Sequence, residues 1–131
     1  MPTLANITVK KADGTTDTVY TALVGAGADG TPSRHRAEAG GQVVGWRPLL
    51  TIFAKPNTNG SGRNVTGRFK FPVVRSVGGV DTLIGTVPLE ISGTVGNGFT
   101  QSEIDEAVTQ GINLFSSVQV RDSFKQAYAP R

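Results

Sequence analysis

The sequence has no cysteine, one histidine and one tryptophan among its 131 residues. Without cysteine, disulfide bonds and thiolate metal sites are excluded, and a reducing compartment is expected. No apolar run approaches the roughly 20 residues with which a helix crosses a bilayer. Residues Met1–Asn6 lack the basic and apolar stretches of a signal peptide. We therefore expect neither an export signal nor a membrane partner.

With one histidine and no cysteine, the sequence has few side chains suited to catalysis or metal binding. A catalytic triad or a histidine metal site would have to use His35, which lies between Arg34 and Arg36. These two cations disfavour a protonated imidazolium, and we expect His35 to be an exposed strand residue. The acidic residues between positions 103 and 106 are explained by a helix start. We therefore expect no catalytic residue, no bound metal and no cofactor.

A glycine pattern at residues 25–30, Gly-x-Gly-x-x-Gly, matches the letters of a dinucleotide-binding fingerprint. That fingerprint requires a helix that opens directly from the loop, so that the helix N-terminus holds the pyrophosphate. Here Thr31-Pro32-Ser33 follows, and the next segment has the composition of a strand. The pattern is therefore interpreted as a loop.

Positive charge is concentrated in the middle of the chain. From Arg34 to Arg75 there are eight basic residues and one acidic residue, Glu38, for a formal charge of +7. The whole chain carries only +3, so the flanking segments are weakly acidic. Such a distribution indicates a surface that faces a polyanion.

Strand composition dominates the first three quarters of the chain, and the whole sequence has 17 glycines and seven prolines. Leu4–Lys11 and Thr16–Val24 flank an Asp-Gly turn, which predicts an N-terminal hairpin within residues 1–24. Strands are expected at Ser33–Ala39, at Gln42–Lys55 with a break at Gly45 or Pro48, and over residues 63–75 and 82–95, so that residues 33–95 form a sheet. A turn is expected at Gly40-Gly41.

The segment Arg63–Arg75 alternates with a period of two. Its even positions carry Asn64, Thr66, Arg68 and Lys70, and its odd positions carry Val65, Gly67, Phe69 and Phe71. Alternation of this kind places the polar and basic set on one face of a strand and the apolar set on the other.

Helical spacing replaces alternation after Gly98. Thr100 and Glu103 form a capping box, and an apolar stripe follows, composed of Ile104, Ala107, Val108, Gly111, Ile112 and Phe115. A second helix is expected from Val118, so that residues 100–128 are helical. Strands followed by two helices predict a single α+β domain over residues 1–131.

Two interpretations of the basic strands remain open from the residues alone. The first is a solvated polar face, which is the ordinary role of charged strand residues. The second is a nucleic-acid contact, in which basic side chains bind phosphate while threonine and asparagine reach bases or sugars. The regional charge imbalance is the observation that favours the second. Its candidate residues are Thr51, Lys55, Asn64, Thr66, Arg68 and Lys70.

The order of these parts resembles the coat proteins of single-stranded RNA bacteriophages, the levivirus family. The resemblance spans nearly the whole chain, and its most specific stretch runs from Arg63 to Pro72, through Val77-Gly78-Gly79-Val80, to Val87–Ile91. It implies an N-terminal hairpin, an antiparallel five-stranded sheet, and two C-terminal helices on one face. It also implies an intertwined homodimer in which two sheets become continuous.

The same resemblance implies a major capsid protein without enzymatic activity. Dimers would assemble in the bacterial cytoplasm into a T=3 icosahedral virion and hold genomic single-stranded RNA on the inner sheet face. The RNA-binding residues carried over are Thr51, Lys55, Thr66, Arg68 and Thr86, where Thr86 takes a position that can hold a base-stacking aromatic. Loop 76–81 would adapt its conformation through Gly78-Gly79 around the symmetry axes of the shell.

The alternative from another class is a small RNA-binding module that does not assemble. It explains the basic residues equally well, but it does not explain the two terminal helices or the Val-Gly-Gly-Val loop. A small hydrolase or isomerase is a third alternative, and it lacks an acid–base pair.

Overall fold

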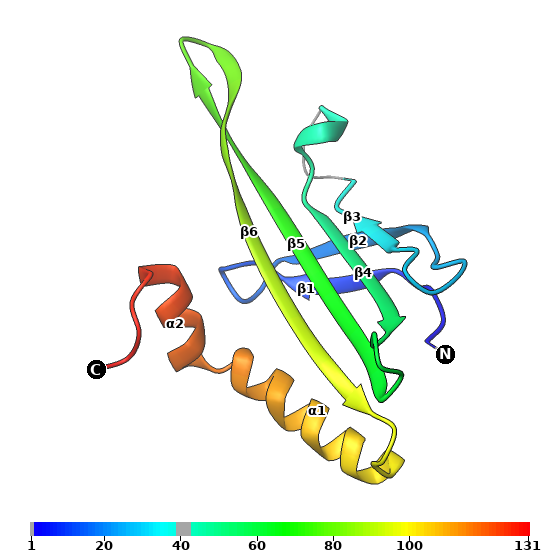
Figure 1. The fold of residues 1–131 in the computed structure, drawn as a ribbon. Coiled ribbons are helices and arrows are strands. Elements are labelled where there is room, and N and C mark those ends of the chain that lie inside the picture. The colour runs from blue at the N-terminus through cyan, green and yellow to red at the C-terminus, as the bar shows by residue number, and fades with distance from the viewer. Residues whose placement is uncertain (1, 39–42) are drawn as a thin grey trace. The chain divides into compact units, whose positions relative to one another are not determined.

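The computed structural model describes residues 2–38 and 43–131. Within them the chain forms six strands, one short 3-10 helix and two α-helices (Figure 1). It divides into two compact units, Met1–Val95 with the strands and Gly96–Arg131 with the α-helices. Strands followed by helices confirm the predicted α+β class.

The six strands follow one another across the first unit in sequence order. They are β1 (Ile7–Lys10), β2 (Asp17–Val24), β3 (Ser33–Arg36), β4 (Leu49–Pro56), β5 (Gly62–Val77) and β6 (Val80–Gly96). The four pairs from β1 to β5 are antiparallel. Because β2 pairs with β3, the predicted N-terminal hairpin is continuous with the rest of the sheet. The sheet therefore has six strands, whereas a five-stranded sheet beside a hairpin was expected.

Two hairpin turns are set by residues that the sequence identified. At Gly78 and Gly79 the φ angles are 60° and 81°, a pair of positive values that a type I′ hairpin turn requires and that glycine accepts without steric cost. In the first hairpin, the Asp13 carboxylate accepts hydrogen bonds from the Thr15 and Thr16 amides, both at 2.9 Å. The Thr16 hydroxyl donates to the same carboxylate. These contacts close the β1–β2 turn.

Between β3 and β4 the chain departs from the predicted strands. β3 ends at Arg36, and a 3-10 turn at Val44–Trp46 precedes β4, which begins at Leu49 after Pro48. Pro48 has no amide hydrogen to contribute to a ladder. Its carbonyl accepts a hydrogen bond from the Ala37 amide at 3.1 Å. The break predicted near Gly45 or Pro48 is thus present, and the turn predicted at Gly40-Gly41 lies outside the described residues.

His35 is buried, so the prediction that it is exposed was wrong. Only 4% of its surface is accessible, and its Nε2 lies 3.0 Å from the carbonyl oxygen of Ala5. On β3 it alternates with Arg34 and Arg36, and its cross-strand neighbours are Ala22 and Leu50. Period-two alternation turns His35 toward the apolar face of the sheet, which the charges of its sequence neighbours do not reveal.

The apolar face of the sheet carries the side chains that pack together in the first unit. Leu50 lies opposite Phe69, and Ala54 lies opposite Val65. The Phe69 ring meets the edge of Tyr20 at 5.9 Å between centroids, and it lies 6.2 Å from the Phe71 ring. Burial raises the pKa of the Tyr20 hydroxyl. Phe69 and Phe71 therefore share the apolar face, as their alternation predicts.

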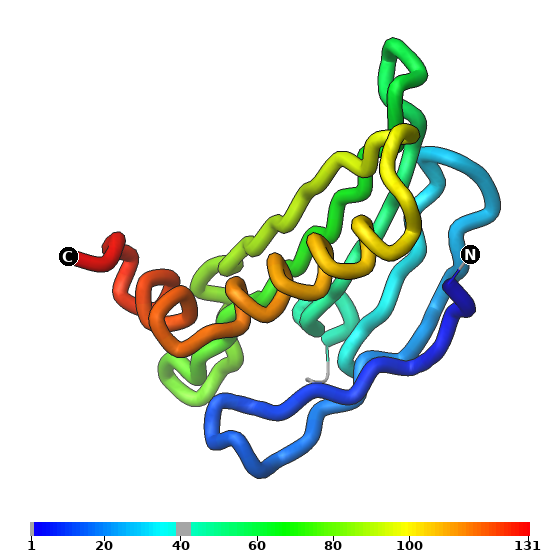
Figure 2. Tube along the Cα trace, turned by 90° about the horizontal axis from the view of Figure 1, so that it is seen from below, coloured from blue at the N-terminus to red at the C-terminus, as the bar shows by residue number. Residues whose placement is uncertain are grey.

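The second unit contains α1 (Gln101–Phe115) and α2 (Val118–Gln126). The Thr100 hydroxyl accepts a hydrogen bond from the Glu103 amide at 3.3 Å, which is the predicted cap. α2 starts after two serines and turns away from the axis of α1 (Figure 2). It ends at Ala127, which adopts a left-handed conformation with φ of 60°.

Large apolar side chains remain exposed in both units. Among the described residues, the buried apolar side chains are those of Tyr20, Ala37 and Pro48, and neither α1 nor α2 has a buried residue. The exposed set includes Leu83, Ile84, Val87, Leu89 and Ile91 on β6, and Val108, Ile112, Leu114, Phe115 and Phe124 on the helices. Neither unit buries a substantial core of its own.

The Asp13 turn predicts a pH dependence. Hydrogen bonds from Thr16 and Thr15 lower the pKa of the Asp13 carboxyl from 3.8 to about 2. A lowered folded-state pKa contributes stability that is present above 3.8 and is lost as the pH falls toward 2. Carboxyl NMR titration should place the Asp13 midpoint near 2. Thr16→Val, which removes the hydroxyl donor, should raise this midpoint, and equal midpoints near 3.8 in both proteins would contradict the account.

The two faces of β5 predict unequal costs of truncation. Phe69→Ala removes a ring that packs on Tyr20 and should lower the free energy of unfolding by roughly 3 kcal/mol. Thr66→Ala, its control on the other face of the same strand, should change it by less than about 0.5 kcal/mol. Denaturant unfolding measures both values. A larger loss for Thr66→Ala than for Phe69→Ala would show that the faces are assigned the wrong way round.

Candidate nucleic-acid interface

The polar face of the sheet brings together the residues predicted on β4 and β5. Across these strands Thr51 lies opposite Arg68, Lys55 opposite Asn64, and Thr66 opposite Phe53. Directly opposed residues of an antiparallel pair project to the same face. The predicted set Thr51, Lys55, Asn64, Thr66, Arg68 and Lys70 therefore shares one face, opposite to the face of Phe69.

β6 extends this face by contacts between side chains. The Thr94 hydroxyl donates to the Asn64 amide oxygen at 2.9 Å, and Arg68 Nε donates to a Glu90 carboxylate oxygen at 3.1 Å. Thr86 lies four residues before Glu90, a spacing that returns it to the same face of the strand. We name this surface, made by β3 to β6 on the side of Arg68, the polar face.

β3 adds two arginines to the polar face. Arg34 lies opposite Thr51, and Arg36 lies opposite Leu49, whose partner on β5 is Lys70. The candidate set omitted both arginines. A signal was present, because the sequence Ser-Arg-His-Arg at residues 33–36 alternates with a period of two.

The basic block, residues 34–75, has fewer unpaired cations than its charge count indicates. Glu38 pairs with both Arg36 and Arg47, while Arg63 pairs with Asp29. Arg68 pairs with Glu90 on β6. Four of the eight basic residues between positions 34 and 75 therefore have an acidic partner. Two of the three acids involved, Asp29 and Glu90, come from outside that block.

The Arg63–Asp29 pair joins the loop before β3 to the start of β5. The hydrogen bond from Arg63 lowers the pKa of the Asp29 carboxyl, and the same contact raises the pKa of Arg63. The Gly30 amide also donates to the carbonyl of Ala54 at 2.8 Å. Residues 25–32 therefore form a loop, as expected for a glycine-rich segment with no helix after it. The loop contacts β4 through Gly30 and β5 through Asp29.

Two neighbouring side chains, Phe53 and Glu90, orient the Arg68 guanidinium on the polar face. Its Cζ atom lies 5.2 Å from the centroid of the Phe53 ring, within the range of a cation–π contact. Its Nε bonds to Glu90. Both side chains of this ion pair are 53% exposed, and pairs this exposed contribute at most about 1 kcal/mol to stability. The guanidinium is thus oriented by its neighbours while it stays accessible to solvent.

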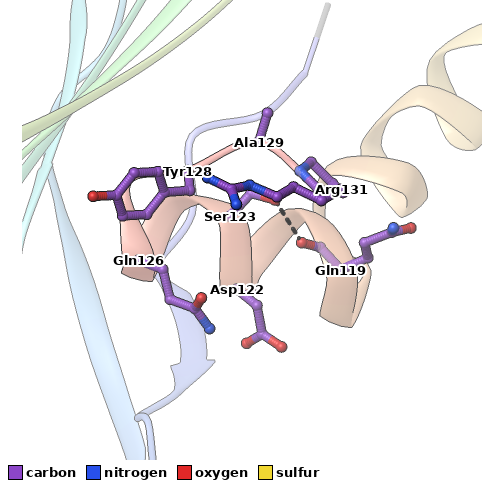
Figure 3. A pocket seen from close by; sticks show the side chains of 8 residues that line it. Gln119, Asp122, Ser123, Gln126, Tyr128, Ala129 and Arg131 are labelled. Carbon is purple, nitrogen blue, oxygen red and sulfur yellow. Dashed lines mark hydrogen bonds between the residues drawn. The ribbon is translucent and has the colours of Figure 1, made fainter.

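A recess of about 430 Å³ lies in the second unit between α2 and the last residues of the chain (Figure 3). Its lining includes the carboxylate of Asp122, the guanidinium of Arg131 and the phenol of Tyr128. The Ser123 hydroxyl donates a hydrogen bond to the carbonyl oxygen of Gln119 at 3.0 Å.

Residues 2–38 and 43–131 contain no group of three or more histidine, cysteine, aspartate or glutamate side chains placed to hold a metal ion. Over the same residues, no helix combines the length and the hydropathy that crossing a bilayer requires.

Comparison with known proteins gives matches in structure alone. No family model matches the sequence, and no curated protein matches it. The virus-like particle of Beihai levi-like virus 21 aligns over 99% of this chain and 99% of its own, with a TM-score of 0.81 and 20% identity. The virus-like particle of bacteriophage NT-214 aligns over 99% and 100%, with a TM-score of 0.81 and 17% identity.

A third match is the bacteriophage GA protein capsid, which aligns over 96% of both chains with a TM-score of 0.72 and 12% identity. These matches extend over nearly the full length of the chain and of each neighbour. The resemblance predicted from the order of strands and helices is thus confirmed at the level of the fold: the chain has the fold of bacteriophage coat proteins.

Proposed function

We propose that this chain is the major capsid protein of a single-stranded RNA bacteriophage. It assembles as homodimers into a closed icosahedral shell and binds genomic RNA on the polar face of its sheet. The observation that carries the proposal is the full-length match to phage coat proteins and virus-like particles, with TM-scores from 0.72 to 0.81 for the three compared above. The role is structural, with no catalytic step and no cofactor.

Exposed apolar surface supports the homodimer. β6 is the last strand in the sheet order, so one of its edges has no strand partner within the described chain. An open edge with exposed apolar residues favours association with another strand. Leu89 and Ile91 on β6 are 43% and 54% exposed, and Ile112 and Phe115 on α1 are 55% and 53% exposed. A second copy supplies both a strand for the edge and apolar surface for the helices.

Assembly beyond the dimer requires surfaces that adapt to different neighbours. The β5–β6 hairpin extends past the shorter strands to a turn at Gly78-Gly79 (Figure 1). Glycine at both turn positions permits backbone conformations that other residues avoid. We infer that this turn accommodates different contacts around the symmetry axes of a T=3 shell.

The polar face supports RNA as the partner. Lys55 and Lys70 supply positive charge for phosphate, while Arg68, Thr51, Asn64, Thr66 and Thr86 supply hydrogen-bonding groups for the RNA. We infer that this face lines the inside of the shell, where the genome lies. The assembled protein is then a component of the virion, formed in the cytoplasm of the bacterial host.

Expression of the chain alone in bacteria tests the proposal. Electron microscopy should show regular closed particles, and the purified particles should absorb at 260 nm because they contain host RNA. Size-exclusion chromatography of dissociated particles should give dimers. A uniform monomer at micromolar concentration would contradict assembly and would favour the alternative of a small RNA-binding module.

A charge-neutralised variant separates shell formation from RNA binding. Lys55→Gln/Lys70→Gln removes two cations from the polar face and should lower the RNA content of the particles while dimers persist. Arg121→Gln/Lys125→Gln, on α2, is the control with the same loss of charge and should leave the RNA content unchanged. Equal RNA content in all three proteins would show that another surface binds the genome.

A further inference from the structure

Four residues form a row across the polar face from β3 to β6. Arg34 lies opposite Thr51, Thr51 lies opposite Arg68, and Arg68 bonds to Glu90. The row therefore contains two arginines, and of these two only Arg68 has a carboxylate beside it. The two arginines are in different electrostatic situations although they lie on the same face.

Arg68 is locally neutralised. Glu90 Oε2 lies 3.1 Å from Arg68 Nε, and the guanidinium also rests over the Phe53 ring. A phosphate that approaches Arg68 meets the negative charge of Glu90 at nearly the same distance. Since the potential near the pair is the sum of both charges, its attraction for a polyanion is small.

Three other cations on this face are exposed and have no acidic partner among the described residues. They are Arg34, Lys55 and Lys70. Arg34 and Arg68 flank Thr51 on neighbouring strands, whereas Lys70 lies two residues beyond Arg68 on β5. Each presents a full positive charge to solvent on the side of the sheet that carries the threonines.

We propose that Glu90 masks Arg68, and that phosphate binding on the polar face is carried by Arg34, Lys55 and Lys70. Arg34 is thereby a further RNA-contacting residue that the family resemblance does not assign. Arg68 with Glu90 acts as a neutral unit that contributes shape and hydrogen bonds but little net charge. This inference rests on the proposed function, because it concerns the RNA that the polar face binds.

The salt dependence of RNA binding measures how many cations neutralise phosphate, and it therefore tests the roles proposed for Arg34, Arg68 and Lys70. Each cation that neutralises a phosphate of a single strand releases counterions. Log affinity then falls more steeply with log salt concentration, and the magnitude of this slope increases by about 0.7. Removal of a free cation should lower the slope by about that amount. Removal of a carboxylate and its paired cation together should leave the slope unchanged.

The experiment measures the affinity of the purified homodimer for a fluorescent oligouridine RNA over a series of salt concentrations. Arg34→Gln and Lys70→Gln should each lower the slope by about 0.7, and Lys11→Gln, away from the face, should not. Arg68→Gln/Glu90→Gln should keep the wild-type slope. Glu90→Gln alone should raise both affinity and slope, because it exposes the charge of Arg68 while its amide oxygen still accepts from Nε.

The outcomes distinguish this inference from the proposed function. If Arg68→Gln/Glu90→Gln lowers the slope as much as Lys70→Gln does, Arg68 is a direct phosphate contact and the masking is wrong. If Arg34→Gln keeps the wild-type slope, Arg34 is not a contact. Arg34→Lys retains the charge and should retain the slope, which separates a loss of charge from a folding defect. Wild-type dimers whose affinity for RNA does not change with salt would contradict the proposed RNA partner itself.

Discussion

A single chain leaves much of its large apolar surface uncovered. Among the described residues, the sheet unit buries few side chains deeply, and the two helices bury none. Burial of apolar area is the dominant favourable term in folding, so a chain with this distribution gains most of it from a partner. The proposed homodimer, which completes the sheet at β6, explains why the alternating strands and the apolar helix stripe are both present. In that proposal folding and association are one equilibrium, and stability depends on protomer concentration.

The opposite side of the same sheet is governed by electrostatics. Alternation along β5 separates Phe69 from Arg68, so that one strand serves both the apolar face and the polar face. Ion pairs then divide the cations of the polar face into masked and free ones. The net charge of the basic block therefore overstates the charge available to a polyanion. Under the proposed function, a moderate surplus of positive charge suits the binding of RNA of varied sequence without a defined contact to each base.

Short-range patterns predicted much of this fold because their causes are local. The Asp13 turn, the Gly78-Gly79 turn and the Thr100 cap each depend on residues within three positions of one another. The two-faced strand and the placement of the predicted polar set follow from period-two alternation. Long-range contacts were not predictable in this way. Glu90 lies 22 residues from Arg68, and the burial of His35 depends on neighbours from two other strands, so neither could be obtained from sequence neighbours.

Under the proposed function, the polar face is the surface that meets RNA in the assembled shell. Ultraviolet cross-linking of RNA inside purified particles, followed by mass spectrometry of the peptides, tests it directly. The account predicts cross-linked peptides from residues 49–56 and 62–77, with RNA attached to side chains of the polar face. Cross-links confined to the helices of residues 101–126, or to the side of the sheet that carries Phe69, would contradict it.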